Sequence, residues 1–288
     1  MIPLSFMRDI AHVVLPPAAS NHQSRIALTV EYDGSAFSGW QKQSSPVLNT
    51  VQQALENALA KIADHSVSII CAGRTDAGVH ATSQIVHFDS RKPRDFKAWI
   101  DGVNSLLPRE IRVVRASRVE ESFHARFTAI YRRYCYLIST ASVASGIFHG
   151  NITCIKGLLN TQAMHGAAQQ LLGEHDFSAF RAAGCQSVSA KRNVFAISVI
   201  DWFGITVIDV RANAFLQHMV RNICGSLIDI GKGKQKESWI GEVLDSKDRM
   251  RAGITAPPDG LYLVEVGYPG ESLLDNGPRF PLILAGYE

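Results

Sequence analysis

The segment Ile26–Tyr32, which reads IALTVEY, sets the character of the fold. Its isoleucine, leucine, valine and tyrosine occupy every second position, and this period of two predicts a half-buried β-strand. Apolar residues at helical spacing predict a helix over 51–62. Thr50 and Gln53 have the spacing of a capping box, in which each side chain bonds the backbone of the other residue. A strand followed by a capped helix therefore opens the ordered part of the chain.

Four further elements complete a β-α-β-β-α-β order in the first half of the chain. Alternating apolar residues predict the strands, and a helical stretch separates the last two. The elements are a strand over 67–71, a strand over 84–88, a helical stretch over 97–105 and a strand over 111–114. This is the ferredoxin-like split βαβ order, which is built on an antiparallel sheet.

The second half of the chain also combines strands and helices. The predicted elements are a strand over 131–138, a helix over 161–172, a hairpin of strands 193–200 and 205–212 joined through Trp202, Phe203 and Gly204, helices over 215–230 and 238–244, and a strand over 261–266. We therefore predict an α+β fold of two ferredoxin-like, RRM-like halves with antiparallel sheets. The expected division is a flexible tail over 1–23, an N-terminal α/β domain over 24–127 that carries the loop around Asp76, and a C-terminal α/β domain over 128–288.

Positive charge is concentrated in one segment of the sequence. The 288 residues contain 29 Lys and Arg against 26 Asp and Glu, a net charge of +3. Residues 91–133 alone hold eleven basic and five acidic side chains, a local net charge of +6, so the rest of the chain sums to −3. This distribution fits either a surface for a polyanion or an ordinary solvated face.

The cysteines and the apolar runs argue against several classes of protein. The five cysteines are scattered and form no C-x-x-C pair, which argues against a disulfide framework or a zinc knuckle. No apolar run approaches the roughly 18 residues that span a bilayer. Arg8 and Asp9 interrupt the apolar N-terminal segment, so it does not fit a secretion signal. We expect a cytoplasmic protein with no metal and no membrane segment.

The densest chemical signal is Cys71–Ala81, which reads CAGRTDAGVHA. Gly73 and Gly78 frame Asp76 in a tight loop between two predicted strands, where glycine permits a sharp turn and the close approach of a ligand. The glycine spacing resembles a phosphate-binding loop, but the lysine and the Ser or Thr of that motif are missing. From this loop alone, Asp76 is either a turn residue or a reactive carboxylate.

Five ordered motifs resolve the role of this loop. They are EYDGSAFSGWQKQ (31–43), GRTDAGVHA (73–81), FHARFTAIYRRYCY (123–136), NAFLQHMVRNICGSL (213–227) and GLYLV (260–264). Through these motifs, most of the chain resembles the tRNA pseudouridine synthase A family. The resemblance implies isomerisation of uridine to pseudouridine at positions 38, 39 and 40 in the anticodon arm of tRNA. It implies no metal and no redox cofactor.

The resemblance also implies roles for individual residues. The catalytic aspartate falls on Asp76, the base-stacking tyrosine on Tyr134, and the ion-pair partner of the aspartate on Arg221. Arg74 is implied to help push the target base out of its stack. Enzymes of this family work as homodimers, with the tRNA lying across both subunits. The remaining RNA-contacting positions are Leu261, which lines the pocket, and Arg126, Arg132 and Arg133 on the basic surface.

The residue types suit this reaction. The glycosidic bond must break, and the detached uracil must rotate without diffusing away, so an enclosed pocket with an aromatic wall is required. The carboxylate of Asp76 can attack the base, attack the ribose or abstract a sugar proton, and the sequence leaves these three routes open. In each route Asp76 starts ionised. A guanidinium such as that of Arg221, within about 4–6 Å, lowers a carboxylate pKa by roughly 1–3 units.

Two other classes of function compete with this one. A non-catalytic RNA-binding protein with two RRM-like sheets would explain the basic segment and the tyrosines, but the RNP1 pattern of an RRM is missing. An aspartate-nucleophile hydrolase would usually have a second carboxylate nearby, and Asp89 is the closest acid after Asp76. The histidines do not have the spacing of a ligand set, and we expect four of them to be structural or to face RNA: His80, His87, His124 and His218.

Overall fold

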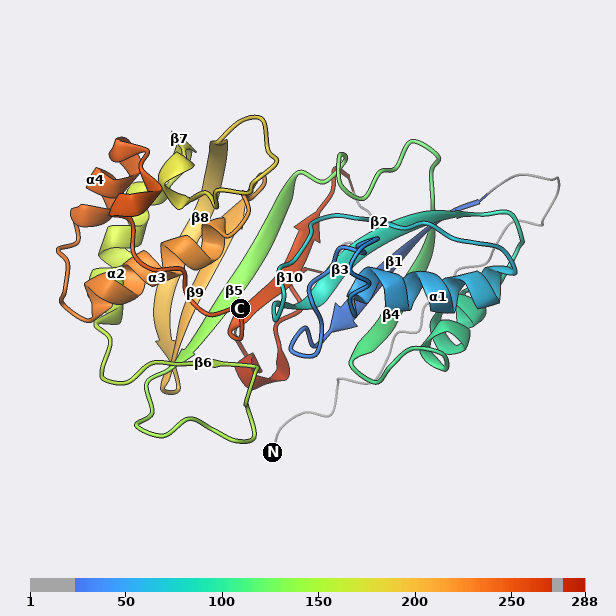
Figure 1. The fold of residues 1–288 in the computed structure, drawn as a ribbon, viewed down its shortest axis with the longest axis horizontal. Coiled ribbons are helices and arrows are strands. Elements are labelled where there is room, and N and C mark those ends of the chain that lie inside the picture. The colour runs from blue at the N-terminus through green and yellow to red at the C-terminus, as the bar shows by residue number, and fades with distance from the viewer. Residues whose placement is uncertain (1–23, 271–276, 288) are drawn as a thin grey trace.

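The computed structural model describes residues 24–270 and 277–287, so the predicted flexible tail over 1–23 lies outside the described residues. Ten strands form one sheet in the order β4-β1-β3-β10-β5-β9-β8-β7, with β2 beside β3 and β6 beside β5. Figure 1 shows this sheet running along the molecule, with helices packed against it. Among the described strands, only the pairs β3–β10 and β5–β6 are parallel. The predicted α+β class is confirmed.

The N-terminal half has the strand order that the sequence predicts. Its strands lie in the order β4-β1-β3-β2, and all three pairs are antiparallel, as in a ferredoxin-like sheet. In chain order, the elements are β1 (Ser24–Tyr32), α1 (Val51–Ala63), β2 (Ile70–Cys71), β3 (His80–Ser90), a π-helical segment (Ala98–Gly102) and β4 (Ile111–Val119).

The C-terminal half repeats the same spatial order. Strands β10-β5-β9-β8 correspond to β4-β1-β3-β2, and β7 is added at the outer edge. The strands are β5 (Tyr131–Ser139), β6 (Thr153–Cys154), β7 (Gly173–Asp176), β8 (Lys191–Trp202), β9 (Ile205–Ala212) and β10 (Leu261–Gly267). The helices are α2 (Thr161–Ala168), α3 (Met219–Gly231) and α4 (Trp239–Ser246), with single 3₁₀ turns at Gln169–Leu171, Ser178–Phe180, Arg249–Arg251 and Leu282–Leu284.

The two halves share one sheet because β10 pairs with both. It runs antiparallel to β5 and parallel to β3, where Tyr262 lies opposite His80 and Leu263 opposite Ala81. Alternation along a strand does not reveal which strand will be its neighbour, so the sequence did not predict this junction. Since β3 begins at His80, the junction lies directly after the loop that carries Asp76.

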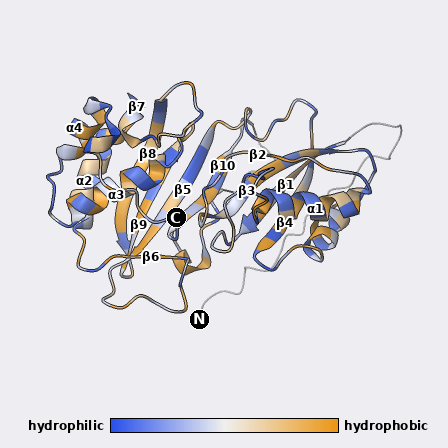
Figure 2. Ribbon diagram, viewed as in Figure 1, coloured by the Kyte–Doolittle hydropathy of each residue, from blue (hydrophilic) through white to orange (hydrophobic). Residues whose placement is uncertain are grey.

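Apolar layers cover both faces of the sheet. The larger core lies between the sheet and the helices, and Figure 2 shows α1 banded with apolar and polar residues, as an amphipathic helix should be. A smaller core on the opposite face includes Cys135, Val207 and Val264, and the C-terminal residues Leu284 and Tyr287 cover it. Within the described residues, no helix is both long and apolar enough to span a membrane.

Three local predictions need correction. Thr50 Oγ1 accepts from the Gln53 backbone N–H at 3.4 Å, but the Gln53 amide donates to Asn57 at 2.7 Å, so the capping box is only half formed. Trp202 belongs to strand β8, and the hairpin turn is narrower than predicted. Helix α3 starts at Met219 rather than at residue 215, because the preceding residue has a left-handed backbone with a φ of 61°.

Candidate active site

The loop over residues 72–79 connects β2 to β3 and carries Asp76. Its central residue Thr75 is anchored by two bonds. The Trp40 backbone N–H donates to the Thr75 carbonyl at 3.0 Å, and Tyr32 Oη lies 2.8 Å from Thr75 Oγ1. Both the backbone and the side chain of Thr75 are therefore fixed, which also defines the position of the adjoining Asp76.

Two glycines let this loop pass close to its neighbours. Gly78 has a φ of 78°, and a Cβ added there would lie 2.8 Å from Pro258 Cγ. Gly73 accepts a hydrogen bond of 2.6 Å from the Gln84 amide, and a Cβ added to it would lie 3.6 Å from Tyr134 Oη. The loop thus packs against the segment before β10 on one side and approaches the tyrosine hydroxyl on the other.

The side chains of Arg221 and His218 both contact the carboxylate of Asp76. Arg221 Nη1 lies 3.3 Å and His218 Nε2 lies 3.4 Å from the same oxygen, Oδ2. Among the described residues, neither of these contacts nor any other side-chain hydrogen bond involves Oδ1. The Asp76 side chain is 28% exposed, so a ligand can reach it. Asp76 comes from the N-terminal half and both partners come from the start of α3, which places the site at the meeting of the two halves.

Arg221 is positioned by the segment that precedes β10. Its Nε donates to the Ala256 carbonyl at 2.8 Å, and the Ala256 backbone N–H donates to the Arg221 carbonyl at 3.1 Å. This segment lies so close to α3 that a Cβ on Gly225 would be 1.8 Å from the Ile254 carbonyl oxygen. One edge of the guanidinium is therefore bound to the backbone, and the other is directed to Asp76.

Tyr134 lies in β5 beside the aspartate loop. Its side chain is buried, and its ring meets the Phe215 ring edge-on, with centroids 5.1 Å apart. Burial and the nearby negative charge of Asp76 raise the pKa of Tyr134 well above its ordinary value, so its hydroxyl is protonated at neutral pH. Leu261 is also buried, at the start of β10, two residues before Leu263, which lies opposite Tyr134. The structure thus brings Asp76, Arg221 and Tyr134 together and places Leu261 on an adjacent strand.

His218 is a site residue that the sequence analysis did not single out. It was grouped with the structural histidines because no ligand spacing connected it to the others. Its spacing of three residues from Arg221 was the available signal, since residues three apart in a helix lie on the same face. The contact to Asp76 arises although His218 itself stands just outside α3, in the left-handed conformation.

Arg132 and Arg133 do not form the basic RNA surface that was predicted. Both lie in β5, in the middle of the sheet, where side chains point into the layers on either face. Arg133 binds Asp209 with a shortest distance of 2.6 Å. Arg132 is 8% exposed, and its guanidinium donates to the backbone carbonyls of Ala72, Arg126, Ala129 and Asn213. These guanidinium groups hold the fold together.

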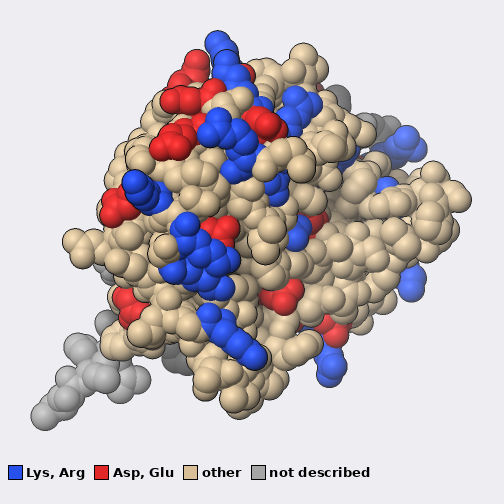
Figure 3. All heavy atoms as spheres, turned by 60° about the vertical axis from the view of Figure 1, so that its left-hand side comes forward, with Lys and Arg blue, Asp and Glu red and all other residues tan. Residues whose placement is uncertain are grey.

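Arg74 and Arg126 have the opposite character. Both side chains are exposed, and neither has an acidic partner within the described part of the chain. Three other basic residues of the 91–133 segment are paired with acids: Lys92 with Asp64, Lys97 with Asp101 and Arg109 with Glu110. Figure 3 shows that Lys and Arg also gather on the face of the C-terminal half, mixed with acidic residues. Positive charge is therefore distributed over both halves.

The other candidate groups lie away from Asp76 or serve the fold. Asp89, the nearest acid in sequence, binds Arg25 at 2.8 Å. His80 is buried and stacks on Tyr262, with ring centroids 4.6 Å apart. His87 is buried and accepts a backbone hydrogen bond. In the ranges that the structure describes, no group of three or more His, Cys, Asp and Glu side chains is arranged to hold a metal ion.

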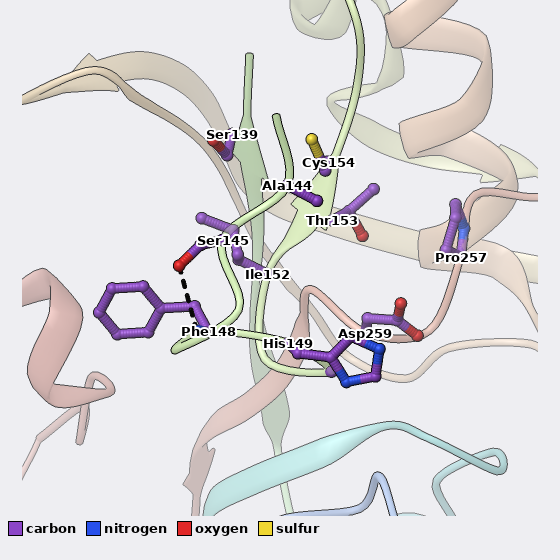
Figure 4. A pocket seen from close by; sticks show the side chains of 11 residues that line it. Ser139, Ala144, Ser145, Phe148, His149, Ile152, Thr153, Cys154, Pro257 and Asp259 are labelled. Atoms are coloured by element: carbon purple, nitrogen blue, oxygen red, sulfur yellow. Dashed lines mark hydrogen bonds between the residues drawn. The ribbon is translucent and has the colours of Figure 1, made fainter. Parts of the chain in front are cut away.

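A cavity of about 200 Å³ lies between residues 139–154 and the segment before β10. Figure 4 shows His149 and Asp259 at one end of it and Cys154 at the other. None of its lining residues belongs to the predicted site. The cavity is therefore separate from the group around Asp76.

Comparison with known proteins places this site in a family. The family model described as tRNA pseudouridine synthase matches residues 28–128 and 167–269, which together include Asp76 and Arg221. The chain belongs to the tRNA pseudouridine synthase family. Members of this family are isomerases, and the matched ranges contain both the aspartate loop and the start of α3.

Curated relatives match nearly the whole synthase. The tRNA pseudouridine synthase A of Legionella pneumophila (strain Lens) is 50% identical over 261 residues, covering 90% of this chain and 98% of the relative. That of Pseudoalteromonas atlantica is 51% identical, with coverages of 91% and 98%. That of Aliivibrio fischeri (strain MJ11) is 50% identical, with coverages of 90% and 98%. A solved Cbf5-Nop10-Gar1 complex has a TM-score of 0.33 at 11% identity, covering 84% of this chain and 50% of that chain.

Proposed function

We propose that this synthase isomerises uridine to pseudouridine at positions 38, 39 and 40 in the anticodon arm of tRNA. The relatives that match 90% of the chain bear the name tRNA pseudouridine synthase A, and the motifs that resemble that family surround Asp76. The observation that carries the proposal is the aspartate itself. It is held at 3.3 Å by Arg221 and at 3.4 Å by His218, yet remains partly exposed.

The contacts of Asp76 suggest which carboxylate oxygen reacts. Arg221 and His218 both lie against Oδ2, and an oxygen that accepts from a guanidinium is the poorer nucleophile or base. Oδ1 is left for the substrate. In each of the three routes, whether attack on the base, attack on the ribose or abstraction of a sugar proton, the fixed positive charge of Arg221 lies beside the reacting carboxylate. This assignment does not choose among the routes.

Tyr134 and Leu261 supply the enclosed surroundings that the detached uracil needs. The tyrosine ring is packed edge-on against Phe215, which leaves it little freedom to rotate. Its protonated hydroxyl can donate a hydrogen bond but carries no charge. A ring fixed in this way can serve as a stacking wall for the base, and the buried Leu261 adds apolar contact. A purely RNA-binding protein would have no use for the partly buried Asp76–Arg221 pair, whose burial costs free energy.

The active unit is proposed to be a cytoplasmic homodimer with one tRNA lying across both subunits. A compact chain of this size has a radius of gyration of roughly 19 Å, which is small beside the distance between the anticodon arm and the elbow of tRNA. A two-fold dimer, the commonest soluble assembly, would extend the basic surface. The boundary between the proposed domains 24–127 and 128–288 falls between β4 and β5, where one ferredoxin-like order ends and the next begins.

The proposal is tested by incubating unmodified tRNA transcripts with the purified protein and mapping pseudouridine at single-nucleotide resolution. We expect pseudouridine at positions 38, 39 and 40 and at no uridine outside the anticodon arm. Transcripts that lack uridine at these three positions serve as the control. Modification of the control at another site, or no modification of any transcript, would contradict the proposed substrate.

A further inference from the structure

The loop over residues 124–129 presents an aromatic side chain to solvent. Phe127 is 74% exposed, and a largely exposed phenylalanine leaves apolar surface in water at a cost in free energy. The loop is held rigidly. His124 and Thr128 exchange backbone and side-chain hydrogen bonds, and His124 Nδ1 accepts from the Phe127 backbone N–H at 3.1 Å. The exposure of the ring is therefore a fixed feature of the fold.

The Phe127 ring has a preferred orientation as well as a fixed backbone. The imidazole of His124 stacks on it, with ring centroids 4.3 Å apart and planes 27° apart. The guanidinium of the exposed Arg126 lies over the same ring, 5.4 Å from its centroid, as a cation–π contact. A ring that is already oriented loses little side-chain entropy when a flat ligand stacks on it.

The loop adjoins the start of the aspartate loop. One nitrogen of Arg132, Nη2, donates both to the Ala72 carbonyl at 2.9 Å and to the Arg126 carbonyl at 2.6 Å, so these two carbonyls lie within a few ångströms of each other. Ala72 opens the loop that carries Asp76. Burial raises the pKa of the Cys71 thiol, and the nearby positive charges of Arg74 and Arg126 both act to lower it. The backbone of the 124–129 loop therefore lies against the start of the loop that carries Asp76.

We propose that Phe127 is a stacking platform for a nucleobase next to the target uridine, with Arg74 and Arg126 binding the adjoining phosphates. This inference rests on the proposed function. An enzyme that acts on a base must first remove it from its stack, and the neighbouring bases then lose a stacking partner. An aromatic face replaces that partner without regard to base identity, and exposed arginines without acidic partners match the charge of the phosphates. We assign RNA as the ligand of this surface because its negative phosphates complement the positive charges of Arg74 and Arg126.

The test uses the full chain and an anticodon stem-loop RNA that contains the target uridine, with 2-aminopurine placed in turn at each flanking nucleotide. Stacking on Phe127 should quench the fluorescence of the probe at one of these positions. Phe127→Leu keeps an apolar side chain without an aromatic face. It should relieve that quenching and raise the Kd for the RNA about tenfold, within the range for loss of one base–aromatic stack. Phe127→Trp should retain both properties.

The matched control is Phe203→Leu, because Phe203 is 91% exposed in the β8–β9 turn, far from the aspartate loop in the fold. It should change neither quenching nor Kd. Wild-type quenching and Kd in Phe127→Leu would overturn the proposal. So would a Phe127→Leu protein that falls from dimer to monomer in sedimentation while quenching persists, because the ring would then be covered by a second copy. A wild-type protein that quenches the probe but forms no pseudouridine would refute the proposed function and leave the platform intact.

Discussion

The connection from β2 to β3 and the connection from β8 to β9 occupy the same place in the two ferredoxin-like halves. The second is a tight turn: Phe203 and Gly204 both have positive φ, at 49° and 85°, which suits a two-residue hairpin of the primed type. The first spans residues 72–79 and is bonded to its surroundings along its length. The same topology thus carries a plain hairpin in one half and the loop with Asp76, our proposed reactive group, in the other.

The comparison shows that the chemistry depends on what the opposite half contributes. The aspartate loop meets Arg221 and His218, which stand after the β9 strand of the C-terminal half. The β8–β9 turn points its exposed phenylalanine away from any such partner. The aspartate meets these partners because β10 joins both halves into one sheet and brings α3 beside the loop. Substitutions at the site test the proposed roles of the two halves, and a substitution at His87 tests the stability of the N-terminal half.

The largest effect among the partners is expected at Arg221. Arg221→Ala removes the hydrogen bond to Asp76 and also the one to the Ala256 carbonyl. A hydrogen bond to a charged group contributes about 1.5–3 kcal/mol, so turnover should fall by about 10–150-fold. Single-turnover assays on a tRNA transcript measure this, and Arg251→Ala, at an exposed arginine nearby, should be neutral. Normal turnover in Arg221→Ala would remove the ion pair from the mechanism.

His218 should have a smaller effect that is confined to the chemical step. His218→Asn removes the contact to Asp76 while keeping a residue type that tolerates the left-handed backbone at this position. We expect kcat to fall by about tenfold, at the lower end for a charged hydrogen bond, with KM and Tm unchanged. An exposed histidine, His149, replaced in the same way provides the control. A fall in Tm without a change in kcat would make His218 a structural residue only.

His87 should make the stability depend on pH. Burial, with the positive charges of Arg25 and His124 nearby, lowers the pKa of His87 from 6.5 to about 4, and its Nδ1 must be unprotonated to accept from the Ala125 N–H. Between pH 6.5 and about 4 the unfolded chain binds more protons at this site, so the free energy of unfolding falls as pH falls through this window. His124, whose pKa is also lowered, adds to this trend.

Urea denaturation at a series of pH values measures this dependence. His87→Gln can still accept the backbone hydrogen bond through its amide oxygen but cannot titrate. It should show a shallower loss of stability between pH 6.5 and 4 than the wild type, whereas His149→Gln should not. Identical pH profiles for His87→Gln and the wild type would rule out His87 as the source.

The smallest effect is expected at Arg126. Arg126→Ala should weaken the binding of every tRNA by a few-fold and reduce the slope of log Kd against log salt concentration by about one. The reason is that Arg126 is exposed and contributes charge to the RNA surface rather than bonds to the fold. Arg132→Ala differs, because it removes five hydrogen bonds to four backbone carbonyls and should lower Tm. An effect of Arg126→Ala on one tRNA alone would indicate that it reads a base.

The types of the elements and the ferredoxin-like order within a half could be predicted from the sequence, but the junction between the halves could not. The alternation in Ile26–Tyr32 is confirmed as β1, and the two-half α+β plan is confirmed by the repeated strand order. That β3 and β10 lie side by side depends on pairs such as Leu263 with Ala81, which are far apart in the chain. An alternation with a period of two predicts which face of the sheet each side chain occupies, but it does not predict which strands lie on either side.

The same limit explains the errors at the site. Arg132 and Arg133 stand beside each other in a basic segment, which is typical of a surface, but their strand has neighbours on both sides and layers on both faces. The prediction that Arg221 pairs with Asp76 rested on a family resemblance and on the cost of a charge in an apolar helix, and the two side chains lie 3.3 Å apart. His218 was missed because its role depends on where α3 begins.

The most direct test compares Asp76 with an aspartate next to the corresponding connection of the C-terminal half. Asp76→Asn should abolish pseudouridine formation on tRNA while the Kd for tRNA stays within a few-fold of the wild type, because phosphate contacts dominate binding. Asp201, near the end of β8, accepts from the Gly204 N–H of the β8–β9 turn at 3.0 Å and is the control, and Asp201→Asn should retain the wild-type rate. Pseudouridine formation by the Asp76→Asn protein at a rate near that of Asp201→Asn would contradict the assignment of Asp76 as the reactive group.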